Sequence, residues 1–222
     1  MRYNIYVINF FIAGDKTMNH ENTYWRNPVY TVKDYYEWKL KTSGSDSVEN
    51  INIEAASVLK WDRLDTLYSF QKIYQIGLQL PVYSEQLKKA RSLTKGIISS
   101  KKTQYELCKY MKDLNIGIEK TGFLPVYFQL GNVIPIWPGG NQDKGAGYDF
   151  PETYFNDNLY WTQALLQKYD NACMDEILNN KIDVDKIKKD ETAYFDYLAT
   201  RMDIIVHRTK NLTKIINSLM KD

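Results

Sequence analysis

The C-terminal end of the chain carries the pattern that most limits its fold. Apolar and small residues recur there at alternating steps of four and three: Leu198, Met202, Ile205, Thr209, Leu212, Ile216 and Leu219. This spacing keeps the residues on one face of an α-helix, so the sequence predicts a long packed helix over about residues 186–220. Arg201, Ile204 and Arg208 share a flank of that helix, because seven residues complete nearly two turns.

Helical patterns also precede this segment. Apolar positions from about residue 55 to residue 80 have the spacing of one long amphipathic helix, which Pro81 closes. Shorter helices are expected over residues 31–40, 84–98 and 103–114. A further helix is expected from about residue 157 to residue 179, with one buried stripe formed by Leu159, Leu166, Tyr169, Cys173 and Ile177.

The hydrophobic period changes between residues 123 and 137. Two β-rich runs, 123–130 and 133–137, lie on either side of Gly131 and Asn132, which is typical of a tight hairpin. Together these patterns predict an α+β fold, mostly helical, with a small antiparallel β-hairpin or sheet. A chain of 222 residues with 44% hydrophobic and 25% charged residues suits a single globular domain over residues 19–222. Residues 1–18 are expected to form a leader or a peripheral strand, and Met18 is an alternative start.

Charge and cysteine content narrow the functional classes. The net charge is only +2, so electrostatics do not require a nucleic-acid or membrane partner. No apolar stretch approaches the roughly 18 residues of a membrane span. Cys108 and Cys173 lie far apart and lack metal-ligand spacing, which favours free thiols in the cytoplasm and no zinc site. The sequence also lacks a P-loop, a dinucleotide fingerprint and a nucleophile elbow, so neither a cofactor nor a metal is expected.

A glycine-rich stretch over residues 131–147 is the candidate binding loop. It contains Gly131, Gly139, Gly140, Gly145 and Gly147, out of 11 glycines in the chain. Glycine lets a ligand or another backbone approach closely, although such a loop also serves simply to connect two elements. We expect a polar site between residues 139–147 and the last helix. The residues expected to bind its ligand by hydrogen bonds or as anion-binding forks are Asn132, Asn141, Lys144, Arg201 and Arg208.

Arg201 and His207 resemble the Arg-x4-6-His element of the HEPN ribonucleases. That resemblance implies a metal-independent site formed across a dimer, with His207 as acid or base and Arg201 stabilising phosphorane charge. Asp203, the polar neighbour, lies one residue later than in the family. The alternative function is therefore an endoribonuclease acting as a toxin or antiphage effector, and the competing interpretation is a surface histidine without a catalytic role.

A larger part of the chain resembles an uncharacterised bacterial domain family. Its members have an aromatic segment ending in Leu-Trp, similar to residues 27–40, then a Gly-x4-Pro run and an Asn-x-x-Arg-Gly loop, similar to residues 131–138 and 141–145. Residues 157–169 match a family helix in outline, with Ala164 and Gln167 among the departures, and the arginine-bearing terminal helix follows. The resemblance implies no established activity.

The favoured hypothesis is a cytoplasmic binding or interaction protein. Its ligand is unidentified, with anionic molecules and RNA as the two classes considered, and no membrane partner is expected. The sequence leaves its oligomeric state open. An interaction scaffold that uses exposed aromatic side chains is a third possibility.

Overall fold

The computed structural model describes residues 52–69, 73, 76, 77, 79–83, 85, 123–138, 140 and 150–221. In this part of the chain, helices predominate and one antiparallel pair of strands forms the sheet, which confirms the expected α+β class. The expected helices over 31–40, 84–98 and 103–114 fall outside the described residues, apart from residue 85. The leader segment 1–18 also falls outside them.

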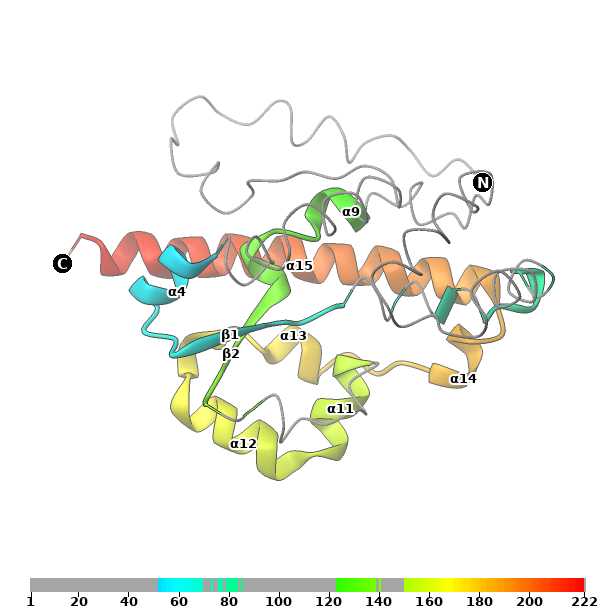
Figure 1. The fold of residues 1–222 in the computed structure, drawn as a ribbon, viewed down its shortest axis with the longest axis horizontal. Helices are drawn as coiled ribbons and strands as arrows, with labels where there is room; N and C mark the ends of the chain where they lie inside the picture. Colours follow the sequence, from blue (N-terminus) through cyan, green and yellow to red (C-terminus); the bar gives the residue numbers. More distant parts are fainter. Residues whose placement is uncertain are drawn as a thin grey trace, which may run out of the picture.

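The long C-terminal helix is α15 (Glu191–Leu219), and it is the centre of the fold (Figure 1). Its predicted stripe is confirmed at Leu198, Met202, Ile205, Leu212 and Ile216, all of which are buried. The start is later than expected because Asp190 caps the helix, accepting a hydrogen bond from the Ala193 amide at 2.8 Å. The preceding residues form a separate short helix, α14 (Val184–Ile187), which has its own cap at Asp183.

The two strands confirm the expected antiparallel sheet, but the expected hairpin is wrong. Strand β2 (Val133–Ile136) pairs with β1 (Arg63–Thr66), in the register Arg63 to Ile136 and Thr66 to Val133. Residues 123–130 do not form a strand; they contribute the one-turn helix α9 (Phe123–Val126), and the 3-10 turn η4 (Leu130–Asn132) follows. Pro125 has no amide to donate to a strand ladder, whereas the first turn of a helix needs none.

The single helix expected over residues 55–80 is also wrong. Helix α4 (Ile53–Val58) stops where Lys60 adopts the left-handed conformation, with a φ of 57°. The Trp61 amide donates to the Ala56 carbonyl at 2.9 Å and the Lys60 amide donates to the Ser57 carbonyl at 3.1 Å, which together form a Schellman ending. Glycine usually occupies this position, and because lysine occupies it here, the sequence did not signal the end of the helix.

The helix expected over residues 157–179 is divided into several elements. The range begins at the last residue of α11 (Pro151–Asp157) and contains α12 (Leu159–Lys168), the 3-10 turn η5 (Asp170–Ala172) and α13 (Asp175–Leu178). Asn158 separates α11 from α12, and Cys173, which has a φ of 53°, precedes α13. Tyr169 and Ile177 of the predicted stripe are buried, but Leu159 is 61% exposed and the buried face of α12 is formed by Trp161, Thr162 and Leu165.

These elements surround α15 on several sides. Figure 1 shows α4, α9 and the strands around α15, and α11, α12 and α13 beyond the sheet. Helix α15 contacts η4, α9, α14, α4 and η5 directly. A short 3-10 turn, η2 (Pro81–Tyr83), completes the described elements. Within the described part of the chain, no helix has both the length and the apolar character needed to cross a bilayer.

Candidate functional site

Two arginines of α15 lie inside the protein. Arg201 and Arg208 are each 1% exposed and are among its largest fully buried side chains. Burial removes water from a guanidinium, so each buried arginine needs hydrogen-bond acceptors or an opposite charge from the protein. The sequence predicted that both arginines share a flank of the helix, and the structure shows that they use this flank for different contacts.

Arg208 binds main-chain oxygen atoms. Its Nε donates to the Cys173 carbonyl at 2.9 Å, and its Nη2 donates to the Ala172 carbonyl at 2.8 Å and to the Val133 carbonyl at 3.1 Å. Its Nη1 donates to the carbonyls of Val133 and Gly131. The side chain therefore ties η5 and the start of β2 to α15. These contacts occupy the donors that an anion at this position needs.

Asn132 is likewise engaged within the fold. Its Oδ1 accepts from the Tyr68 amide at 2.8 Å, and its Nδ2 donates to the carbonyls of Tyr127 at 2.8 Å and Tyr68 at 3.3 Å. The residue is completely buried. Its amide therefore continues the contact between the two strands beyond β1, at the position where the sequence predicted a hairpin turn.

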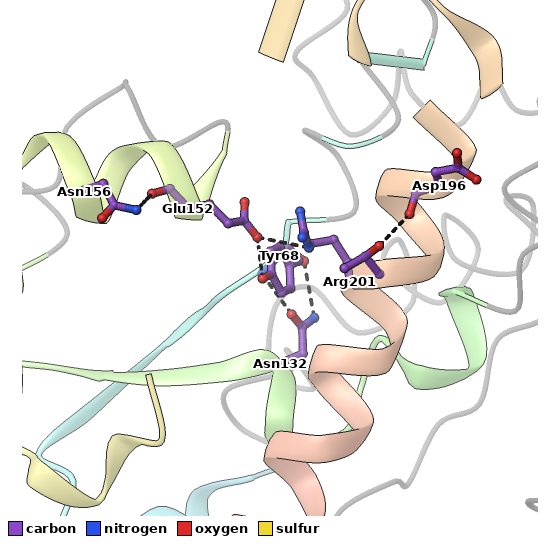
Figure 2. Close-up of polar contacts among 7 residues, drawn as sticks. Tyr68, Asn132, Glu152, Asn156, Asp196 and Arg201 are labelled. Atoms are coloured by element: carbon purple, nitrogen blue, oxygen red, sulfur yellow. Dashed lines mark hydrogen bonds and ion pairs between the residues drawn. The ribbon is translucent and has the colours of Figure 1, made fainter. Parts of the chain in front are cut away.

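Arg201 meets a carboxylate. Its Nε lies 3.0 Å from Oε1 of Glu152 on α11, and the Tyr68 hydroxyl donates to the same oxygen at 2.6 Å (Figure 2). The rings of Tyr197 and Tyr68 lie 4.4 and 5.7 Å from the guanidinium carbon, close enough for cation–π attraction. Glu152 and Arg201 have equally buried side chains, each 1% exposed.

Some atoms of this ion pair lack hydrogen-bond partners. Nε and Nη1 of Arg201 and Oε2 of Glu152 are inaccessible to solvent and form no hydrogen bond with the described residues. The ion-pair distance between Nε and Oε1 is short, but the bond angle does not make it a hydrogen bond. Most buried polar atoms in native proteins are paired, so unpaired atoms on both sides of one ion pair need a specific explanation.

Burial is the largest single influence on the pKa of Glu152, Tyr68 and Arg201. It raises the pKa of Glu152 above its ordinary value of 4.5, although Arg201 and the Tyr68 hydroxyl act in the opposite direction. Burial also raises the pKa of Tyr68 well above 10.0, and the charge of Glu152 adds to this shift. Burial opposes the charged form of Arg201, but the charge of Glu152 and the neighbouring tyrosines outweigh it and raise the pKa of Arg201.

The raised pKa of Glu152 makes stability depend on pH. A folded carboxyl that holds its proton more tightly than the unfolded one stabilises the fold fully below the ordinary pKa of 4.5, and this contribution is lost as pH rises through the folded pKa. The free energy of unfolding should therefore fall, relative to a Glu152→Gln variant, as pH rises from about 4.5. Urea unfolding of both proteins across this range measures the difference, and a difference that is flat or rises with pH contradicts the assignment.

His207 lies away from Arg201. Six residues of helix turn through about 600°, so the two side chains point about 120° apart. The His207 side chain is 63% exposed, and its Nδ1 lies 3.3 Å from Oε1 of Glu176 on α13. Arg201 is buried against Glu152 instead. The fold of one chain therefore does not bring the two residues of the Arg-x4-6-His element together.

Replacing His207 should have little effect on stability. An exposed contact between a histidine and a carboxylate contributes at most about 1 kcal/mol, so a His207→Ala variant should unfold within about 0.5 kcal/mol of the wild type. Urea unfolding measures this difference. A loss above about 2 kcal/mol would show that His207 has a structural contact of another kind.

The described residues that begin and follow the glycine stretch both contact α15. Asn141 and Lys144 lie outside the described residues, but its first residue, Gly131, is held by Arg208 and Thr209. Glu152, which follows the stretch by five positions, is paired with Arg201. The sequence predicted that partners of this stretch come from the last helix, but it did not identify Glu152 or Tyr68. A buried arginine needs hydrogen-bond acceptors or an acidic partner, and among the 27 acidic residues of the chain no local signal selects Glu152 as the partner of Arg201.

No three His, Cys, Asp or Glu side chains gather to form a possible metal site within the described ranges. The resemblances to the bacterial domain family and to the HEPN ribonucleases stay predictions. Comparison of the chain with protein-family models, with curated proteins and with solved structures found no match.

Proposed function

We propose that this chain is a cytoplasmic binding protein whose polar site lies between residues 139–147 and α15, with Arg201 and Glu152 as its charged groups. The observation that carries the proposal is the set of unpaired atoms on this buried ion pair: Nη1 of Arg201 and Oε2 of Glu152 have no hydrogen-bond partner in the described part of the chain. Asn141 and Lys144, which belong to the adjoining stretch in the sequence, are proposed as further ligand contacts.

The physical argument concerns the free energy lost when a charge is buried without all of its hydrogen bonds. A buried charge that keeps unused hydrogen-bonding capacity destabilises the protein, and replacing a buried pair with apolar residues is often neutral or stabilising. Binding sites are where such unused capacity has a purpose, because a ligand completes the hydrogen bonds. Arg208 shows the contrast, since its guanidinium is engaged by carbonyls of the fold itself.

The test is a ligand screen by thermal shift with matched variants. A compound present at about 100 times its Kd stabilises the wild type by about 2.7 kcal/mol. We expect Arg201→Gln to abolish the shift and Asn141→Ala with Lys144→Ala to weaken it. Lys214→Gln removes one charge from an exposed position of α15, about 20 Å along the helix, and should leave the shift intact.

Two outcomes would count against this proposal. A shift that persists in Arg201→Gln places the site elsewhere, and a broad screen without any shift argues that the Arg201–Glu152 pair is purely structural. RNA cleavage by the wild type that disappears in His207→Ala would instead support the endoribonuclease hypothesis, in which Arg201 and His207 act across a dimer. A wild-type protein that does not cleave RNA would exclude the endoribonuclease hypothesis.

A further inference from the structure

We infer that the buried Arg201–Glu152 pair fixes the docking position of α11, meaning its place along the axis of α15, and that the pair does so without adding to the stability of the fold. The inference goes beyond the proposed function, because it concerns the folded chain alone and holds with or without a ligand. It follows from what lies on the same flank of α15 on either side of Arg201.

The pair itself is a poor source of stability. Both side chains are 1% exposed, and the attraction between two buried charges offsets their loss of water only when further hydrogen bonds satisfy their remaining atoms. Nε and Nη1 of Arg201 and Oε2 of Glu152 have no hydrogen-bond partner in the described part of the chain. Burial raises the pKa of Glu152 although Arg201 and Tyr68 act in the opposite direction, so these partners do not fully offset the loss of water around its charge.

The apolar contacts of α11 do not select a docking position by themselves. The helix buries Pro151, Tyr154 and Phe155, and the ring of Phe150 just before it meets the ring of Tyr197 on α15 edge-on at 5.5 Å. Attraction between apolar surfaces is non-directional and depends on the area removed from water. Because the buried apolar stripe of α15 extends along most of that helix, such contacts alone would also form with α11 displaced by one turn, about 5.4 Å.

The charge of Glu152 excludes these displaced positions. Figure 2 shows its side chain extending from α11 to Arg201 on α15. The turns before and after Arg201 present Leu198 and Ile205 on the same face, and both are fully buried. Displacing α11 by one turn would leave the carboxylate buried beside one of these apolar side chains, and a buried charge without a partner destabilises a fold far more than a misplaced apolar contact does.

Two turns away, the polar side chains of this flank are already engaged. All three nitrogens of Arg208 donate to main-chain carbonyls, and the hydroxyl of Tyr194 donates to the carbonyl of Ile73 at 3.0 Å. Between residues 194 and 208, Arg201 is therefore the buried cation with which Glu152 can pair.

The stability half of the inference is tested by removing all polar partners together. A triple variant, Arg201→Met with Glu152→Met and Tyr68→Phe, fills the same space with apolar side chains and leaves no member of the cluster unpaired. Because such joint replacement is often neutral or stabilising, we expect the midpoint of urea unfolding to equal or exceed that of the wild type. Glu152→Met alone should have a clearly lower midpoint, since it leaves the charge of Arg201 without a counterion.

The docking position is measured as a distance between two spin labels. Asp157→Cys at the end of α11 and Lys214→Cys on α15 provide exposed attachment points, in a chain whose Cys108 and Cys173 are replaced by serine. Pulsed electron paramagnetic resonance should give one narrow distance distribution for the wild-type cluster. In the triple variant we expect a broad distribution, or a second maximum about 5 Å from the first. His207→Ala, which removes an exposed contact between α15 and α13, should keep the narrow distribution.

A second neutral variant keeps the test decisive if the triple variant does not fold. Glu152→Gln with Arg201→Met removes both charges but retains an acceptor for the Tyr68 hydroxyl, and it should show the same broad distribution. A narrow, wild-type distribution in a folded neutral variant would show that apolar packing sets the docking position, and would overturn the inference. Neutral variants that both unfold, or that both unfold at lower urea than the wild type, would show that the pair stabilises the fold, which would overturn it as well.

Discussion

Replacing Gly131 with alanine is expected to destabilise the fold by at least about 3 kcal/mol, among the largest effects of any single substitution proposed for this chain. A Cβ atom at this position would overlap the carbonyl oxygen of Ile205 and lie 2.7 Å from Oγ1 of Thr209 and 2.8 Å from the Ile205 carbonyl carbon. Because the obstruction is mainly the backbone of α15, it cannot be relieved by rotating a side chain.

The substitution would also disturb hydrogen bonds that depend on this close approach. The Gly131 amide donates to Oγ1 of Thr209 at 2.9 Å, and its carbonyl accepts from Arg208. Moving η4 away from α15 lengthens both contacts. Urea unfolding followed by circular dichroism measures the change, with the m-value reporting whether unfolding stays two-state.

Gly140 provides the matched control. A Cβ atom there would meet Cβ of Ile136 at 3.3 Å and ring atoms of Trp137 at 3.7 Å, so a shift of a few tenths of an ångström relieves the closest contact. We expect Gly140→Ala to change stability by less than about 1 kcal/mol in either direction. If the two variants lose the same stability, the contact between η4 and α15 is not what makes Gly131 necessary.

Replacing Arg208 with methionine is expected to lower the free energy of unfolding by about 3 to 5 kcal/mol, the second large effect. Methionine keeps much of the apolar volume but donates no hydrogen bonds. The main-chain oxygens that Arg208 now satisfies would then lack their donor inside the protein: Gly131, Val133, Ala172 and Cys173. Urea unfolding measures this loss directly.

Arg208→Lys separates the charge from the geometry of the guanidinium. A single ammonium cannot reach all the carbonyls that lie around the edge of the planar guanidinium, so the lysine variant should recover only part of the lost stability. The neighbouring exposed variant, His207→Ala, serves as the control. Wild-type stability in Arg208→Met would show that the carbonyls find other donors, and the role assigned to this side chain would be wrong.

The mostly helical fold and its central helix could be predicted because their signal is local. Alternation of four and three residues places Leu198, Ile205 and Leu212 on one face of any α-helix, whatever packs against it. The caps were less predictable. Asp183 caps the short helix α14 and Asp190 caps the long helix α15, and only the structure showed the capping hydrogen bonds that divide the two.

The strand partners could not be predicted in the same way. The run 133–136 was expected to pair with its neighbour in sequence, but it pairs with residues 63–66, about seventy positions earlier. A β-strand forms its ladder hydrogen bonds with another segment, and the sequence of one strand does not specify that segment. The end of α4 was not predicted either, because Lys60 adopts a left-handed conformation that glycine usually adopts at the end of a helix.

The same distinction between local spacing and contacts with distant segments applies to the candidate site. Residue spacing was enough to predict that the last helix is long, which of its faces is apolar, and that Arg201 and Arg208 share a flank, since helical geometry follows from spacing alone. The packing of distant segments determines that Arg208 binds carbonyls while Arg201 contacts Glu152 with unpaired atoms remaining. The environment of a buried charge is set by segments distant in sequence, and the spacing of residues along one helix contains no information about them.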